Sequence, residues 1–294
     1  MRSSRHFRSG YGTFDRTQTQ EPKRHHRRCP PGLYIVGIGP GSVEHLSYRA
    51  KEILTAAECI VGYTTYVNLV KPLIEDKEIV ATAMKKEIQR VQTAVESAKS
   101  GKICALISSG DPGIYAMAGL VLELCKAQSI PITPVGVGSN LTSSQASLLI
   151  EIVPGIPALA AGASLLGAPL THDFAAISLS DLLTPWSMIE KRLAAAAQAD
   201  FVIVLYNPKS KRRKEQLPLA QKIILQHRSP ETPVGIVVGA MRPEQDVTIM
   251  ALKDLHTAFV NMQTTIFVGN SVSATYGPFM FTPRGYAGKY ELKA

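Results

Sequence analysis

Residues 33–41 read Leu-Tyr-Ile-Val-Gly-Ile-Gly-Pro-Gly, an apolar run that ends in a glycine-rich turn. Apolar side chains then recur at helical spacing over residues 44–57, so the segment predicts a buried strand, a tight turn and a helix. Glycines at such a turn let backbone amides approach a ligand. Pro40 removes one amide donor, however, and the glycine spacing of a dinucleotide site is absent. The turn therefore favours a neutral or cationic nucleoside ligand over NAD.

The chain continues this alternation of apolar runs and amphipathic segments, which predicts an α/β fold with helices covering a parallel sheet. We predict two α/β domains with a ligand cleft between them, residues 32–153 and residues 154–294. The first sheet is expected to be mostly parallel. The second is expected to be mixed, because its last three apolar runs follow one another with only one weak helix among them. Residues 136–149, rich in Gly, Ser, Asn and Thr, are predicted to form a surface insertion.

The composition is that of a globular protein, with 45% hydrophobic and 19% charged residues in a chain of 294. Residues 1–31 hold eight of the 32 Lys and Arg but only two of the 23 Asp and Glu, and so carry +6 of the net charge of +9. This segment is predicted to be a flexible basic tail. The uncharged stretch of residues 152–171 could span a bilayer by its length, but it contains three prolines, so we expect no membrane-spanning segment.

The four cysteines show no paired spacing of the kind that zinc sites use. They indicate neither a metal site nor a disulfide framework, and a reducing cytoplasm is the expected location. We therefore predict no metal bound by the protein. The cysteines are Cys29, Cys59, Cys104 and Cys125.

Three further turns follow apolar runs and could face the same cleft. Gly110-Asp111-Pro112 follows the strand predicted at residues 103–107, and Asp111 can face the amine or hydroxyl of a ligand. The alternative is an Asp-Pro turn in which the carboxylate has only a capping role. Residues 153–158 and 205–208 form comparable turns in the second half of the chain. Because these turns come from both halves, a ligand held between the domains is expected.

In this order, the turns Gly37-Ile38-Gly39-Pro40-Gly41, Gly110-Asp111-Pro112 and Pro154-Gly155-Ile156 resemble those of the tetrapyrrole methylases, the class III S-adenosylmethionine-dependent methyltransferases. The resemblance extends from residue 33 to about residue 290. It implies the two-domain fold of that family, S-adenosylmethionine as methyl donor, S-adenosylhomocysteine as product, and a homodimer.

Two segments narrow the resemblance to one group within the family. Residues 177–186 read Ile-Ser-Leu-Ser-Asp-Leu-Leu-Thr-Pro-Trp, and residues 199–208 are followed by the basic run of residues 209–214. Both are similar to the family's C17-methyltransferases of corrin (cobalamin) biosynthesis. The resemblance thus implies methylation of precorrin-3B or cobalt-factor III with contraction of the macrocycle, any cobalt arriving inside the substrate. The alternatives are another tetrapyrrole methylase, such as a uroporphyrinogen III or C20 enzyme, or an RNA-binding or RNA-modifying protein that uses its basic segments.

The resemblance also implies site residues. The family often has Ser or Thr where this chain has Pro157, so a backbone contact is expected there. The residues expected to bind the cofactor are Pro40, Gly110, Asp111, Pro112, Ile114, Tyr115, Pro157, Ala158, Tyr206, Asn207, Gly239 and Ala240.

Ring contraction needs proton transfers, for which His172, Asp173 and Tyr63 are the candidates. A His-Asp dipeptide can equally be a capping or salt-bridge feature, and Tyr63 with Tyr66 can be ordinary turn packing. Basic side chains suit the acetate and propionate groups of a tetrapyrrole. The residues expected to bind the substrate are Tyr66, Ser180, Lys209, Lys211 and Arg212.

Overall fold

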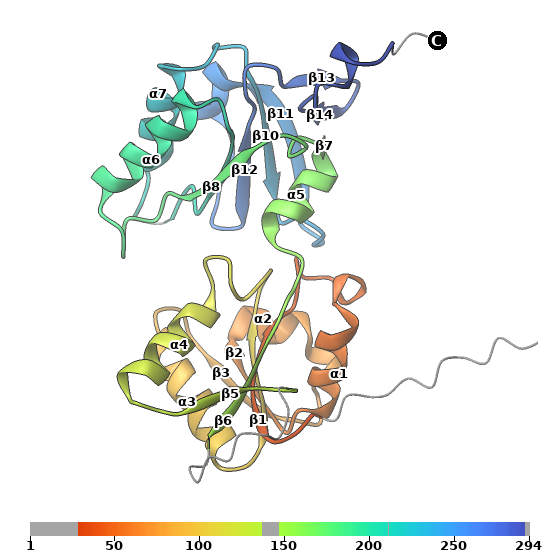
Figure 1. Ribbon diagram of the computed structural model, residues 1–294, viewed down its shortest axis with the longest axis vertical. Helices are drawn as coiled ribbons and strands as arrows, with labels where there is room; N and C mark the ends of the chain where they lie inside the picture. Colours follow the sequence, from red (N-terminus) through yellow and green to blue (C-terminus); the bar gives the residue numbers. More distant parts are fainter. Residues whose placement is uncertain (1–28, 137–146, 211, 292–294) are drawn as a thin grey trace, which may run out of the picture.

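The computed structural model describes residues 29–136, 147–210 and 212–291. Two lobes lie one above the other in Figure 1, and the chain passes between them in the connection from strand β6 (Leu148–Val153) to helix α5 (Ala158–Leu166). Each lobe has one large sheet, and a small three-stranded sheet, β13-β14-β7, lies in the second lobe. The arrangement is the two-sheet α/β architecture that the alternation of the sequence predicts.

The first sheet is parallel throughout, with the strand order β3-β2-β4-β1-β6-β5. Alternate residues of β1 point to opposite sides of the sheet, and helices cover both faces. Leu33 and Ile35 pack with residues of α3 and α4, whereas Tyr34 and Val36 pack with residues of α1. The other elements of this lobe are β1 (Gly32–Gly37), η1 (Val43–His45), α1 (Tyr48–Ala56), β2 (Cys59–Tyr63), α2 (Thr64–Leu69), η2 (Lys71–Leu73), β3 (Glu78–Thr82), α3 (Glu87–Lys99), β4 (Ile103–Ser108), α4 (Met117–Ala127) and β5 (Ile132–Pro134).

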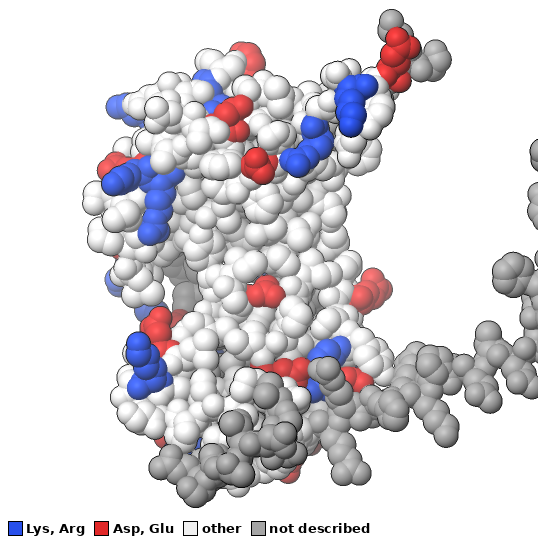
Figure 2. All heavy atoms as spheres, in the orientation of Figure 1, with Lys and Arg blue, Asp and Glu red and all other residues white. Residues whose placement is uncertain are grey.

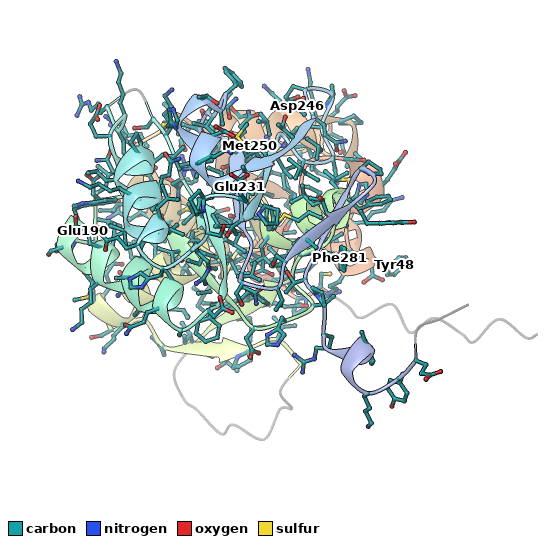
Figure 3. The ribbon with its side chains drawn as sticks, turned by 90° about the horizontal axis from the view of Figure 1, so that it is seen from above. Tyr48, Glu190, Glu231, Asp246, Met250 and Phe281 are labelled. Carbon is teal, nitrogen blue, oxygen red and sulfur yellow. The ribbon has the colours of Figure 1, made fainter. Side chains whose placement is uncertain are left out.

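The second sheet is mixed, with the order β11-β10-β12-β9-β8. Only β8 and β9 are parallel, and the other neighbours are antiparallel. Seen from above, Glu190 on α6 and Asp246 on β11 lie at opposite sides of this lobe (Figure 3). The elements are β7 (Gly167–Ala168), β8 (Phe174–Ser178), α6 (Trp186–Gln198), β9 (Val202–Tyr206), α7 (Gln216–Leu225), β10 (Pro233–Val238), β11 (Asp246–Ala251), η3 (Leu252–Thr257), β12 (Thr264–Val268), β13 (Ala274–Tyr276), β14 (Phe279–Phe281) and η4 (Tyr286–Gly288).

The predicted fold class is confirmed, but some local predictions need correction. Strand β3 was not predicted: it lies at the edge of the sheet, and three of its five residues are exposed, so its sequence lacks the apolar pattern of a buried strand. The predicted insertion at 136–149 overlaps the start of β6, a strand paired with β1, and its residues 137–146 lie outside the described residues. Of the predicted tail, residues 1–28 also lie outside them. The boundary between residues 153 and 154 stays a prediction.

The uncharged stretch of residues 152–171 forms the end of β6, a turn, helix α5 and the short strand β7. Within the described ranges, no helix is long and apolar enough to cross a membrane.

Three glycines bring the ends of neighbouring strands into backbone contact. A Cβ added to Gly155 would lie 2.1 Å from the carbonyl oxygen of Gly110 and 2.9 Å from that of Gly37. A Cβ on Gly37 would lie 2.6 Å from the amide nitrogen of Gly155 and 2.7 Å from the carbonyl oxygen of Gly110. Because the obstacles are backbone atoms, no side chain can move aside to admit a methyl group.

We expect Gly155→Ala to lower the free energy of unfolding by about 2–3 kcal/mol, since the added methyl group must displace a strand end. Urea denaturation measures this. The matched control is Gly119→Ala on α4, where an added Cβ meets nothing within 4 Å. That variant should be as stable as the wild type, or more stable by about 0.5–1 kcal/mol. Equal stabilities of the two variants would contradict the close approach.

Candidate active site

A pocket of about 570 Å³ lies between the two sheets and is lined by residues of both lobes. Its volume is in the range of small-molecule sites. On the face drawn in Figure 2, Lys, Arg, Asp and Glu lie mainly towards the two ends of the molecule, and the middle is largely uncharged. The pocket walls come from the turns that follow β1, β2, β4, β9 and β10, so it sits at the carboxyl ends of strands, where α/β proteins bind ligands.

The first-lobe wall is held together by main-chain bonds. Gly39 and Gly110 form a two-way bridge, with N–H···O distances of 3.1 and 2.8 Å. The carboxylate of Asp111 accepts hydrogen bonds from the amides of Gly113 at 2.8 Å and Gly155 at 3.2 Å. Asp111 thus joins the turns after β4 and β6, which is the capping role that the sequence left open, and it also lines the pocket.

Two tyrosines form the neighbouring surface. The rings of Tyr115 and Tyr206 lie 5.1 Å apart between centroids. The Tyr115 hydroxyl donates to the carbonyl of Ala176 in the second lobe at 2.9 Å, and the Tyr206 hydroxyl accepts from the amide of Leu159 at 2.9 Å. Burial raises the pKa of both phenols, that of Tyr206 to about 12. Both rings are therefore neutral near pH 7, and this part of the pocket is aromatic and uncharged.

The structure brings eleven of the twelve predicted cofactor residues to the pocket. Pro112 is the exception: it is buried behind the turn, against Gly37. The residues in the lining are Pro40, Gly110, Asp111, Ile114, Tyr115, Pro157, Ala158, Tyr206, Asn207, Gly239 and Ala240.

Arg242 completes this wall and was missed by sequence reasoning. Its Nε donates to the carbonyl of Pro40 at 2.6 Å, and its Nη2 donates to the Ser109 hydroxyl at 3.0 Å. The side chain therefore ties the turn after β10 to turns of the first lobe. Its position just after the predicted Gly239-Ala240 turn could have indicated that it lines the pocket. Other lining residues that were not predicted are Thr65, Met84, Glu87, Arg90, Ile107, Ser108, Ser109, Ala116, Met117, Met262, Gln263, Thr264 and Thr265.

Tyr63 and Tyr66 line the part of the pocket beside β2 and β3. Their rings meet edge to face with centroids 5.2 Å apart. Burial raises the pKa of the Tyr66 phenol. Both residues are therefore placed where an aromatic wall was predicted.

His172 and Asp173 lie elsewhere. They precede β8, whose carboxyl end at Ser178 faces the pocket, so about five residues of strand, roughly 16 Å, separate the pair from that end. The two side chains are 40% and 71% exposed, and the Asp173 amide donates to Nδ1 of His172 at 2.8 Å. The pair forms a local turn outside the pocket lining, which argues against the predicted acid–base role.

The basic run of residues 209–214 precedes α7, and Lys209 and Arg212 are exposed outside the pocket lining. Ser180 is likewise absent from the lining, and Lys211 lies outside the described residues. The role of these residues in substrate binding stays a prediction. Among the described residues of the run, Arg213 is buried, with 7% exposure.

Arg213 joins the two segments that narrowed the family resemblance. It donates to the Asn207 carbonyl and to the Ser180 hydroxyl, both at 3.2 Å. Asn207, in a left-handed backbone conformation with φ of 52°, donates in turn to the Ser178 hydroxyl at 3.0 Å. The two distinctive segments therefore contact each other behind the pocket wall that Asn207 contributes.

As regards metals, the described residues contain no cluster of three or more His, Cys, Asp or Glu side chains arranged to hold an ion.

Comparison with known proteins identifies the family. The model for Tetrapyrrole (Corrin/Porphyrin) Methylases matches residues 32–256. This chain belongs to that family. The resemblance inferred from the strand-end turns is therefore confirmed, and the parallel first sheet with its mixed partner is the methylase fold.

Individual methylases agree with this assignment. The chain is 47% identical over 260 residues to "Cobalt-factor III methyltransferase" of Priestia megaterium, covering 88% of this chain but 46% of that protein. It is 46% identical over 254 residues to "Probable cobalt-factor III C(17)-methyltransferase" of Salmonella typhimurium, covering 86% of this chain and 99% of that one. The crystal structure of the methyltransferase CobJ superposes with a TM-score of 0.76 at 34% identity, covering 86% and 99% of the two chains. The chain thus spans about half of the first relative and nearly all of the other two.

Arg213→Ala should lower the free energy of unfolding by about 2–3 kcal/mol, because it removes hydrogen bonds made by a buried charged group. The neighbouring Arg212→Ala is the matched control and should change stability little, since Arg212 is exposed. Thermal and urea denaturation of both variants measure the difference. Similar losses in the two variants would show that Arg213 does not join the segments as described.

Tyr206→Phe should cost about 1–2 kcal/mol of folding stability, because the Leu159 amide at the start of α5 loses its acceptor. The exposed Tyr276→Phe serves as control and should have no effect. Urea denaturation is again the measurement. An unchanged midpoint for Tyr206→Phe would mean that another group satisfies the amide.

Proposed function

We propose that this protein transfers a methyl group from S-adenosylmethionine to C17 of a corrin precursor, with contraction of the macrocycle, in cobalamin biosynthesis. The observation that carries the proposal is the 46% identity with the Salmonella protein along nearly its whole length. Cobalt-factor III is the substrate we favour over precorrin-3B, because both curated relatives described above are named for it.

The residues of the pocket fit S-adenosylmethionine. A Cβ on Gly110, where φ is +67°, would point at the Cα of Pro157 from 3.6 Å, so the glycine keeps open the space between the first-lobe turn and α5. Neutral tyrosine rings and backbone groups suit an adenosine, and the pocket carboxylates of Asp111 and Glu87 are compatible with a cation. When bound, S-adenosylmethionine supplies an electrophilic methyl group on a positively charged sulfur.

The chain contributes chiefly by positioning. The turns after β1, β4 and β10 and the start of α5 hold one ligand, and the surface beside Tyr63 and Tyr66 is left for the second. Fixing two reactants in one orientation supplies on the order of several kcal/mol of the rate acceleration. Tyr115 and Arg242 close the seam between the lobes through hydrogen bonds and limit the entry of water.

Proton transfer during ring contraction is assigned to Tyr63. It lines the pocket and carries an ionisable hydroxyl, whereas His172 and Asp173 are outside the lining. A homodimer and a cytoplasmic location stay predictions.

The decisive experiment is mass spectrometry after anaerobic incubation with methyl-deuterated S-adenosylmethionine and, in parallel, cobalt-factor III or precorrin-3B. We expect one label in the product from cobalt-factor III and slower labelling of precorrin-3B. Gly110→Ala should abolish transfer, since its strained methyl group narrows the cofactor space, and Gly119→Ala should retain it. Labelling of uroporphyrinogen III alone would contradict the C17 assignment, and transfer to no tetrapyrrole would contradict the proposed activity.

A further inference from the structure

Arg90 is a buried charge that forms no salt bridge with a carboxylate of the described residues. It lies in the first turn of α3, is 4% exposed and lines the pocket. Among the described residues, no carboxylate lies within salt-bridge distance of it. Burial lowers the pKa of its guanidinium, but an arginine stays protonated under all ordinary conditions. A buried charge of this kind is unfavourable unless something pairs with it.

The guanidinium is held in place with donors to spare. Its Nε donates to the Thr82 hydroxyl at 2.7 Å and its Nη2 to the Ala83 carbonyl at 3.0 Å, while Nη1 lies 3.9 Å from the sulfur of Met117. Its carbon lies 5.9 Å from the centre of the Tyr63 ring. A guanidinium has five N–H groups, so the remaining two have no acceptor among the described residues. Such a fixed fork matches the geometry of a carboxylate.

The other charged residues of the pocket lining, Glu87, Asp111 and Arg242, do not accept from the two remaining N–H groups of Arg90. Glu87, one turn earlier on α3, accepts from the Lys85 amide at 3.1 Å. Asp111 is occupied by two backbone amides, as described above. Arg242 is also positive and is engaged on the far side by Pro40 and Ser109. Glu87 favours the charged form of Arg90 from beyond salt-bridge distance, but no carboxylate of the described lining forms a salt bridge with it, and two of its N–H groups are left for a ligand.

The position of Arg90 separates it from the cofactor turns. Its anchor, Thr82, ends β3, which lies two strands from β4 in the sheet order. At about 4.8 Å between strands, the anchor is roughly 10 Å from the end of β4 along the sheet edge. The surface between them includes Tyr63, Tyr66 and Met117, which offers aromatic and thioether contacts to a flat ligand.

From these observations we infer that Arg90 binds a carboxylate of the tetrapyrrole, one of its acetate or propionate groups, and so orients the macrocycle in the half of the pocket beside β2 and β3. The inference rests on the proposed function for the identity of the substrate. It adds Arg90 as a substrate-binding residue. From the sequence, basic residues that bind the substrate were expected in the run of residues 209–214 instead.

The test compares Arg90→Met with Lys99→Met, a matched charge loss in the last turn of the same helix, where the side chain is exposed. The probes are uroporphyrin III, which carries free carboxylates, and its methyl ester, titrated by fluorescence quenching. We expect Arg90→Met to weaken binding of the acid by about ten- to a hundredfold and to leave binding of the ester unchanged. Lys99→Met should bind both as the wild type does. Calorimetry should find the affinity for S-adenosylhomocysteine unaltered in each variant.

Equal losses for the acid and the ester would overturn the inference, because they would show that Arg90 only supports the loop at Thr82 and Ala83. Unchanged binding of the acid would overturn it as well. Circular dichroism verifies folding, and Arg90→Lys, which retains the charge but not the fork, should discriminate acid from ester less than the wild type does. If the wild type methylates no tetrapyrrole while the Arg90 effect persists, the proposed function fails and the carboxylate site stands.

Discussion

The backbone contact among Gly37, Gly110 and Gly155 is the constraint on which the site depends. Three parallel strands, β1, β4 and β6, end beside one another, and their turns can meet only where no side chain intervenes. Asp111 then satisfies two of the amides that these turns leave unpaired. Because hydrogen bonds to a charged acceptor are stronger than those to a neutral one, the carboxylate stabilises the junction as well as facing the pocket. The glycines therefore determine the shape of the site, and Asp111 places a carboxylate in it.

Much of the fold could be predicted from the sequence, because the elements nearest the site are local in origin. The apolar run at residues 33–41 and the helical spacing over residues 44–57 are clear, and both segments form as expected, with the helix beginning at Tyr48. Strand β3 could not be predicted in the same way, since its residues are mostly exposed at a sheet edge and β3 forms only because β2 is already there.

The site residues could be predicted where they lie in turns. They could not be predicted where their role depends on which end of a strand faces the pocket or on whether a side chain is buried. Turns after strands carry glycine and proline signals, and nearly all of those chosen line the pocket. His172-Asp173 precedes β8. The sequence shows that this pair adjoins a strand, but it does not show which end of the strand faces the other lobe. Arg213 and Arg90 look like surface residues in their charged surroundings. Each is buried where the folded chain brings hydroxyl and carbonyl acceptors of other segments to its hydrogen-bond donors.

The distribution of charge divides the pocket into two halves with different chemistry. In the half beside β1, β4 and α5, the tyrosines are neutral, Arg242 is hydrogen-bonded to main-chain and hydroxyl acceptors, and Asp111 contributes a carboxylate. In the half beside β2 and β3, Arg90 retains two N–H donors, and its charge forms no salt bridge with a carboxylate of the described residues. A tetrapyrrole that presents a carboxylate to this charge is thereby held at one edge. Its opposite edge then extends towards the cofactor half, where a methyl group can reach a ring carbon.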